Sequence, residues 1–290
     1  MGEKIVQDFW DEHAAWSVAA DGLKSSRVFW RTVALILTVA GAALQTWASV
    51  LSKPKSPIGM IGFVSLALVP FITARFLTPE RTRNWLRSRS ISEAIKSEIY
   101  SYRAGADPYT GADALEKLRD KVQEIQSWGK ELALDRARAA AQSSQAPPSL
   151  DVNGYLQARV YEQISKYYQP KATLNATRAE QFRWVETAFA GMAAILGAYA
   201  SFSDSKGVGP WVAVLTTSGG SLSAHAAASR YDFQATTFLA TALQLKDLTH
   251  EWQISGHQAP SKEWSAFVRS CEEVISAENR GWMAKWGQHP

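Results

Sequence analysis

The sequence contains one cysteine, Cys271, among 290 residues. A lone cysteine excludes a disulfide within the chain and a metal site built from several cysteines. Familiar enzyme signatures are also missing, because no G-x-S-x-G, G-x-x-x-x-G-K-[ST] or H-E-x-x-H run occurs. The five histidines are scattered without metal-ligand spacing. We therefore expect neither an enzyme nor a bound metal or other cofactor.

Acidic and basic residues are absent from four stretches. Residues 32–52 and 56–74 form one pair joined by a short turn, and residues 187–203 and 207–229 form a second pair. Each is close to the roughly 20 residues that a helix needs to cross a bilayer. A helix of a soluble bundle, the alternative, would carry a charge about every turn on its outer face. The mean hydropathy of −0.18 averages these stretches with polar ones. We predict an all-α membrane protein with four transmembrane helices in two hairpins.

The two hairpins differ in composition. Residues 32–52 and 56–74 are rich in large aliphatic and aromatic side chains, which favour insertion next to lipid. Residues 187–203 and 207–229 contain many Ala, Gly, Ser and Thr residues, which gain little from lipid but allow helices to approach closely. We therefore expect the second hairpin to lie inside a helical assembly, formed as a homo-oligomer.

Basic residues gather at one end of both hairpins, and the turns hold only Lys53, Lys55 and Lys206. By the positive-inside rule both termini and all long polar segments are predicted to be cytoplasmic. Anionic lipid headgroups, rather than nucleic acid, are the expected partner of these basic residues. The basic residues are Lys24, Arg27, Arg31, Arg75, Arg81, Arg83, Arg87 and Arg89 beside the first hairpin and Lys171, Arg178, Arg183 and Arg230 beside the second.

Outside the apolar stretches the chain repeats one layout. A polar helix precedes each hairpin and polar helices follow it, which predicts a first unit over residues 1–146 and a second over 147–290. Between the helical parts lies a linker, 142–149, that contains Pro147 and Pro148. The polar helices are expected to form a cytoplasmic bundle. Their predicted ranges are 79–141 in the first unit and 155–179, 231–252 and 261–286 in the second.

Short motifs in the polar helices resemble a known family. In the second half they are Tyr155, Leu156, Gln157, Ala158, Arg159, Gln163, Tyr167, Tyr168, Lys171, Ala172, Glu273, Glu278, Asn279 and Trp282. In the first half they are Trp85, Leu86, Glu93, Lys96, Ser97, Glu98, Tyr100, Ser101 and Tyr102. With these residues the second half resembles the SLATT family, the SMODS- and SLOG-associating two-transmembrane effector domains of bacterial conflict systems. The first half resembles a second SLATT subtype, so the chain looks like two such units in tandem.

The resemblance implies a function as well as a fold. SLATT domains are membrane-embedded, pore-forming effectors of antiviral defence, thought to act after a partner senses infection or a nucleotide signal. It therefore implies a multi-pass protein of the bacterial inner membrane and a separate cytoplasmic sensor protein as partner. It supplies no catalytic residues to carry over.

One helical face of the last apolar stretch carries polar groups at a four-residue spacing. Thr217, Ser221, His225 and Ser229 lie on this line, and an ionisable group within a span is a functional candidate by default. Glu186 stands near the start of the preceding stretch, where it would form part of a charged ring at a cytoplasmic pore mouth. These five residues are the predicted pore-lining set.

Two further lines of residues accompany this set. Small side chains beside the polar line are predicted to pack against a neighbouring helix. A thinner polar line in residues 32–52 is the second choice for a pore. The packing residues are Gly220, Ala224 and Ala228, and the second-choice line is Thr38, Gln45 and Ser49.

The same residues allow a non-conducting interpretation. Ser and Thr in membrane helices usually bond the carbonyl one turn back, so a polar stripe is as often a packing surface as a pore lining. The alternative function is therefore a membrane scaffold whose cytoplasmic helices dock partners. Four spans in one chain cannot enclose a wide aqueous path, so conduction requires an oligomer.

Overall fold

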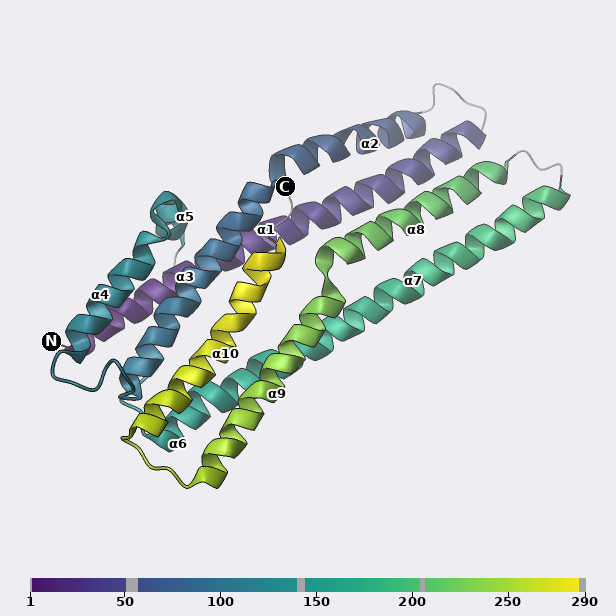
Figure 1. Cartoon of the computed structure of the whole chain (residues 1–290). Coiled ribbons are helices and arrows are strands. Elements are labelled where there is room, and N and C mark those ends of the chain that lie inside the picture. Colours follow the sequence, from purple (N-terminus) through teal and green to yellow (C-terminus); the bar gives the residue numbers. More distant parts are fainter. Residues whose placement is uncertain (1, 51–56, 140–143, 204–206, 287–290) are drawn as a thin grey trace. The chain divides into compact units, whose positions relative to one another are not determined.

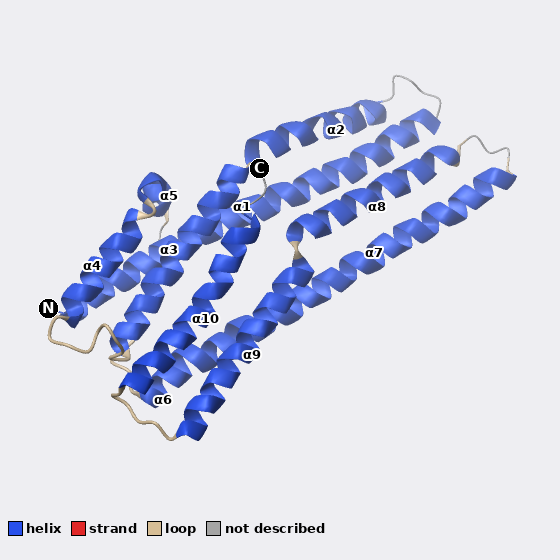
Figure 2. Cartoon of the chain, viewed as in Figure 1, coloured by secondary structure: helices blue, strands red, loops and turns tan. Residues whose placement is uncertain are grey.

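The computed structural model is helical in the residues that it describes, which are 2–50, 57–139, 144–203 and 207–286, with side chains up to residue 277 (Figure 1). Within this part no strand occurs, and loops join the helices (Figure 2). The elements are α1 (Gly2–Val50), α2 (Pro57–Phe76), α3 (Pro79–Arg103), α4 (Ala114–Ser127), η1 (Lys130–Leu132), α5 (Ala133–Arg138), α6 (Val152–Tyr155), η2 (Leu156–Tyr161), η3 (Gln163–Tyr168), α7 (Gln169–Phe202), α8 (Gly209–Ser229), α9 (Tyr231–Ser255) and α10 (Lys262–Trp286).

Three helices of the described chain are long and apolar enough to cross a membrane. They are α1, α2 and the continuous helix Val152–Phe202, which ends as α7. The prediction of an all-α membrane protein is thereby confirmed. The fourth predicted span forms the 21-residue helix α8, but its hydroxylated and small side chains leave it less hydrophobic than the other three. Its place in the membrane stays a prediction.

The chain folds into two compact units. We call Ser26–Thr78 with Thr173–Ala235 the hairpin unit, and Met1–Ser25 with Pro79–Ala172 and Thr236–Pro290 the bundle unit. Each unit draws on both halves of the chain, so these units differ from the predicted sequence units 1–146 and 147–290. The physical reason is that apolar segments pack with apolar segments and polar helices with polar helices, whatever their order along the chain.

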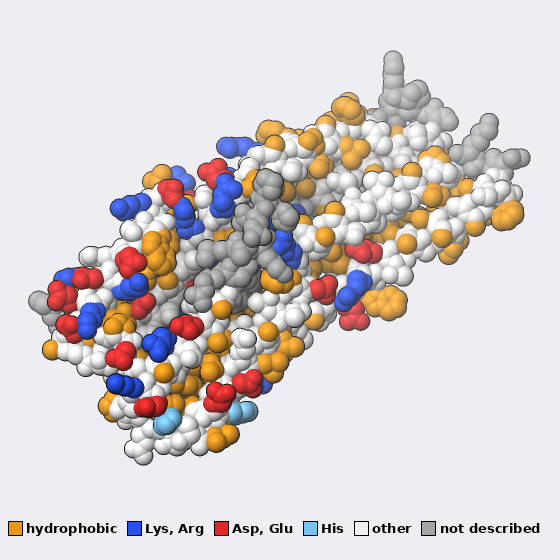
Figure 3. Space-filling model, in the orientation of Figure 1, with side chains coloured by type: hydrophobic (Ala, Val, Ile, Leu, Met, Phe, Trp, Pro, Cys, Tyr) orange, Lys and Arg blue, Asp and Glu red, His pale blue; other side chains and the backbone are white. Residues whose placement is uncertain are grey.

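The bundle unit has a core of its own. Ile91, Ile95 and Ile99 follow one another at four-residue spacing on α3 and are fully buried. Leu118 and Val122 of α4 are fully buried as well, and α3 packs against both α4 and α10. Charged side chains cover much of the visible surface of this unit (Figure 3). Such a pattern is that of a helical bundle in water.

Within residues 79–141 the sequence predicts a helix of about 79–103, a break at 107–111 and a second helix of about 112–141. The first helix and the break are confirmed, whereas the second helix is interrupted after Ser127. α3 ends at Arg103, and after α4 the chain passes through Gly129 into η1 and α5. A Cβ added at Gly129 would lie 2.5 Å from both Ile91 Cδ1 and Trp16 Cη2. The backbone of the turn therefore lies so close to the core that a residue with a side chain would clash with Ile91 and Trp16 at this position. The predicted helices 231–252 and 261–286 correspond to α9 and α10, and the predicted linker is non-helical over residues 144–149.

The hairpin unit is held together by small residues in its first hairpin. A Cβ added at Gly62 of α2 would lie 2.9 Å from the Gln45 backbone nitrogen of α1, and one added at Gly41 would lie 2.8 Å from Leu66 Cγ. These helices therefore touch backbone to backbone. Close packing was predicted for the second hairpin only. In the sequence, Gly41 and Gly62 lie among large aliphatic residues, which indicate contact with lipid and not close helix packing.

Candidate functional site

The predicted pore line on α8 does not lie on one surface of the chain. Thr217 is exposed, Ser221 and His225 are half-buried, and Ser229 is 7% exposed. The inward face of α8 instead carries Ser218, which is 1% exposed. Ser218, Ser221, His225 and Ser229 recur every three or four residues and share one helical face. The inner polar face of α8 therefore contains Ser218, whereas the sequence predicted Thr217 at this place.

Two polar atoms on this inner face are buried without a hydrogen-bond partner among the described residues. They are Ser218 Oγ and His225 Nδ1. The imidazole of His225 stacks on Phe182 of α7, with ring centroids 5.4 Å apart. A buried polar group without a partner costs about 1–3 kcal/mol. The inner face of α8 is therefore a place where water would be stabilised.

Three other hydroxyls of α8, those of Thr216, Ser221 and Ser229, are bonded to its own backbone. Ser221 donates to the Thr217 carbonyl at 2.9 Å, and Thr216 donates to the Val212 carbonyl at 2.9 Å. This arrangement is the one expected of hydroxyls in a packing surface. In α1, Thr38 likewise donates to Ala34 at 2.8 Å and Ser49 to Thr46 at 2.7 Å.

An arginine that precedes the first span binds the end of α8. Arg31 donates to the carbonyls of Ala228 at 3.1 Å and His225 at 3.3 Å, and also to Ser229 Oγ. Arg230 follows in the left-handed conformation (φ 52°) and ends the helix. A cation at a helix C-terminus complements both the unpaired carbonyls and the helix dipole. We call this contact the Arg31 clamp, and it joins the two hairpins. From the sequence, Arg31 was predicted only to favour a cytoplasmic position for this end of the hairpin.

The predicted mouth and packing residues have distinct surroundings. Glu186 is half-buried on α7, one turn after Phe182. Gly220, Ala224 and Ala228 are exposed, and a Cβ added at Gly220 would meet no atom within 4 Å. The small-residue stripe of α8 therefore faces outwards from the single chain.

A second cluster of charge lies inside the bundle unit. Arg159 of η2 donates from Nε to Glu272 Oε1 at 2.9 Å and from Nη2 to Oε2 at 2.6 Å, and both side chains are buried. Tyr155 donates its hydroxyl to Glu272 at 3.0 Å. The Arg159 guanidinium also lies over the Tyr100 ring at 4.7 Å. Burial alone would lower the pKa of Arg159, but Glu272 outweighs it and shifts the pKa upward. Arg159 therefore stays charged inside the core.

More titratable groups surround this pair. Burial opposes ionisation of Glu93, but Lys96, Arg89 and Arg159 hold the pKa of its carboxyl below the usual range. His13 of α1 lies 2.8 Å from Ser92 Oγ and 3.0 Å from the Ser92 carbonyl through Nδ1. Burial, followed by the charge of Lys96, lowers the pKa of His13 from 6.5 to about 4. His13 is therefore neutral at physiological pH.

The shifted pKa of His13 predicts a pH dependence of stability. Between pH 6.5 and about 4 the unfolded chain binds a proton at His13 that the folded chain does not. The free energy of unfolding should therefore fall by about 3 kcal/mol as the pH falls through this window. The difference in denaturant midpoint between wild type and His13→Gln, measured from pH 7 to pH 4, should shrink with acidification. An equal dependence in both proteins would contradict the shift, and exposed His257→Gln is the control.

The motif residues of the polar helices meet in this bundle. Five of them belong to the network around the Arg159–Glu272 pair, through hydrogen bonds, a cation–π contact or nearby charge. They are Tyr155, Arg159, Glu93, Lys96 and Tyr100. Tyr167 and Tyr168 pack on Phe238 at 5.7 and 6.2 Å. Arg159 and Tyr167 lie in η2 and η3, two successive π-helical segments. Segments of this kind are frequent at functional sites. The side chains of Glu278, Asn279 and Trp282 lie outside the described residues.

The acidic partner of this network is not among the residues that the sequence motifs predicted. Glu272, rather than its neighbour Glu273, pairs with Arg159. The available signal was position: Glu272 lies four residues after the buried Val268 and next to the buried Cys271 on the inner face of α10. Among the described residues no group of three or more His, Cys, Asp or Glu side chains is arranged to hold a metal ion.

A known family model matches a part of each half of the chain. Residues 155–282 match the family model of the SMODS and SLOG-associating 2TM effector domain 1. Residues 14–117 match a family described as a protein of unknown function, DUF4231. No curated protein and no solved structure matches the chain. The predicted family of the second half is confirmed, and the SLATT character of the first half stays a prediction.

Proposed function

We propose, from the membership of residues 155–282 in the SMODS and SLOG-associating 2TM effector family, that this chain is a membrane effector that forms an oligomeric pore. The family name supports a membrane effector of conflict systems. Pore formation, oligomerisation and a role in antiviral defence are our own extension. We place the chain in the bacterial inner membrane with both termini cytoplasmic, and we assign it no catalytic step and no cofactor.

The observation that carries the proposal is the pair of unsatisfied polar atoms on α8. Ser218 Oγ and His225 Nδ1 lie two turns apart on one face and are buried without partners among the described residues. Each costs about 1–3 kcal/mol in the dry state and nothing once water reaches it. A movement that wets this face is therefore favoured at these two atoms. The inner face of α8 is the proposed lining of the path, with Glu186 near its mouth.

The outward face of α8 supports assembly. Gly220, Ala224 and Ala228 gain little from lipid, yet they are exposed in the single chain. Helices of neighbouring copies can approach closely at such a stripe. Because four spans cannot surround a wide path, this contact supplies the additional helices that the pore needs.

Ion flux through liposomes tests the proposal, with a matched pair of variants on α8. Ser218→Ala removes an unsatisfied hydroxyl and should stabilise the dry state by about 1–3 kcal/mol, which lowers flux about tenfold. Thr217→Ala makes the same kind of change on the exposed face and should leave flux unchanged. Ser221→Leu should block flux by dewetting, and His225→Ala and Glu186→Gln should alter ion preference.

The competing function is a non-conducting scaffold. The backbone bonds of Ser221 and Thr216 favour it, because these hydroxyls need no water. Absence of flux from a correctly assembled wild type, with and without its sensing partner, would establish the scaffold. Equal flux in wild type and all α8 variants would place the path elsewhere, with Thr38, Gln45 and Ser49 the next residues to test.

A further inference from the structure

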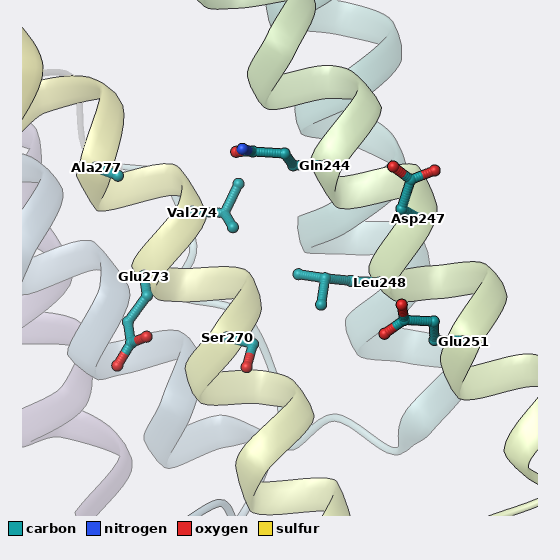
Figure 4. A pocket seen from close by; sticks show the side chains of 8 residues that line it. All are labelled: Gln244, Asp247, Leu248, Glu251, Ser270, Glu273, Val274 and Ala277. Carbon is teal, nitrogen blue, oxygen red and sulfur yellow. The ribbon is translucent and has the colours of Figure 1, made fainter.

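An open groove runs between α9 and α10 of the bundle unit (Figure 4). The two helices are held at one end by aromatic contacts, with Trp252 stacked 5.0 Å from Phe267 and 5.3 Å from Trp264. Beyond these contacts lies a space of about 520 Å³. Four residues of each helix line it. They are Gln244, Asp247, Leu248 and Glu251 of α9 and Ser270, Glu273, Val274 and Ala277 of α10.

The groove has an apolar floor and an acidic rim. Leu248 and Val274 point into the space between the helices (Figure 4). Asp247, Glu251 and Glu273 belong to the lining, which contains no Lys or Arg. The three carboxylates have no ion-pair or hydrogen-bond partner among the described residues, whereas carboxylates on α4 pair with Arg119 and Lys121. The chain as a whole has a net charge of +4, so this acidic rim is a local feature. Carboxylates without a partner in the chain complement a positively charged binding partner.

We propose that the α9–α10 groove docks a basic amphipathic helix of a separate cytoplasmic protein. Aliphatic side chains on one face of that helix would rest on Leu248 and Val274, and lysines or arginines beside them would face the carboxylates. This binding is a property of the bundle unit alone. It rests on the proposed function only for its consequence, which is the coupling of a sensor to the pore.

The dimensions of the groove match a helix. Residues 244–251 and 270–277 each span two helical turns, which accommodates apolar anchors at positions i, i+3 or i+4, and i+7 of a docked helix. The groove is open and its lining has no aromatic or basic side chain, so it lacks the groups that bind a small anionic ligand.

The lining covers about two turns of each helix. An interface of this size fits a weak, reversible complex with a dissociation constant on the order of micromolar.

The test uses the full-length chain in nanodiscs and a defined probe. The probe is a stapled helical peptide of about 18 residues, with leucines at i, i+4, i+7 and i+11 flanked by lysines. A second peptide replaces every lysine with glutamate. Fluorescence anisotropy measures binding, and empty nanodiscs of the same lipids give the signal from membrane partition, which is subtracted.

A charge-reversal pair has a matched control in the chain. Asp247→Lys with Glu251→Lys should weaken binding of the lysine peptide more than about tenfold, because like charges at an interface cost several kcal/mol. Glu116→Lys with Asp120→Lys makes the same change of charge, at the same spacing, on the exposed face of α4 and should leave binding unchanged. The glutamate peptide should prefer the Asp247→Lys, Glu251→Lys protein.

Three outcomes would overturn the proposal. One is no binding of the lysine peptide above empty nanodiscs, and another is equal weakening by both double variants. The third is a smaller oligomer in the Asp247→Lys, Glu251→Lys protein alone, measured by sedimentation, which would assign the groove to a second copy of this chain. Flux of the unliganded wild type is recorded in parallel, so failure of docking is distinguishable from failure of the pore.

Discussion

Replacing Glu272 with alanine is expected to destabilise the bundle unit by about 3–5 kcal/mol. The substitution leaves the Arg159 guanidinium charged in a core where its side chain is 1% exposed. It also removes the acceptor of the Tyr155 hydroxyl, which is buried with them. A loss of this size is comparable to a large part of the stability of a typical domain. Thermal or denaturant unfolding of the purified protein, followed by circular dichroism, measures it.

Two further variants separate loss of the pair from general damage to the core. Glu272→Ala with Arg159→Met removes both charges and should recover most of the lost stability, because hydrophobic residues often replace a buried pair without cost. Glu116→Ala breaks an exposed ion pair with Arg119 and should cost less than about 1 kcal/mol. A loss below 1 kcal/mol for Glu272→Ala would show that the charges are hydrated in solution.

A leucine at Gly62 should affect the stability of the first hairpin, whereas a leucine at Gly220 should affect the association of copies. At Gly62 even a Cβ would press on the Gln45 nitrogen at 2.9 Å and the Gly41 carbonyl at 3.0 Å, so leucine must separate α1 from α2 within the chain. At Gly220 the added side chain meets no atom of the chain within 4 Å. We expect Gly62→Leu to unfold the first hairpin and Gly220→Leu to affect only the association of copies.

Two measurements distinguish these expectations. The midpoint of unfolding in mixed detergent and SDS micelles reports the hairpin unit, and multi-angle light scattering reports the oligomer. Gly62→Leu should lower the midpoint, whereas Gly220→Leu should keep it and reduce the oligomer mass, as should Ala224→Leu. An oligomer that survives both α8 variants would show that copies meet at another surface.

Much of the helical layout could be predicted from the sequence, because it depends on local signals. Charge-free stretches, Pro147 and Pro148, and the helical spacing of apolar residues in 115–132 mark helices and breaks without reference to the rest of the chain. Short motifs within residues 155–282 were also sufficient to show the resemblance to the family.

The side-chain partners could not be predicted, because they depend on helix rotation and on contacts far apart in sequence. The period of four placed Thr217 with Ser221, but a helix turns 3.6 residues, and packing against α7 rotates Ser218 inwards. Arg159 meets Glu272 across 113 residues. The sequence places Glu272 one helical turn after Val268, but it does not show that Arg159 is the partner of Glu272. The role of Gly62 could not be predicted either, because it depends on the α1 backbone that lies against it.

Under the proposed pore function, the Arg31 clamp has a consequence for the leak of an unstimulated cell. A pore that conducts without a signal would dissipate the ion gradients of its own host, so such a pore would have to be closed in nearly every molecule at rest. If opening moves the end of α8 away from α1, Arg31 must release the Ala228 and His225 carbonyls and the Ser229 hydroxyl. Two such bonds to a charged donor are worth about 3 kcal/mol or more. In the proposed pore, that penalty alone would keep fewer than about one molecule in a hundred open at rest.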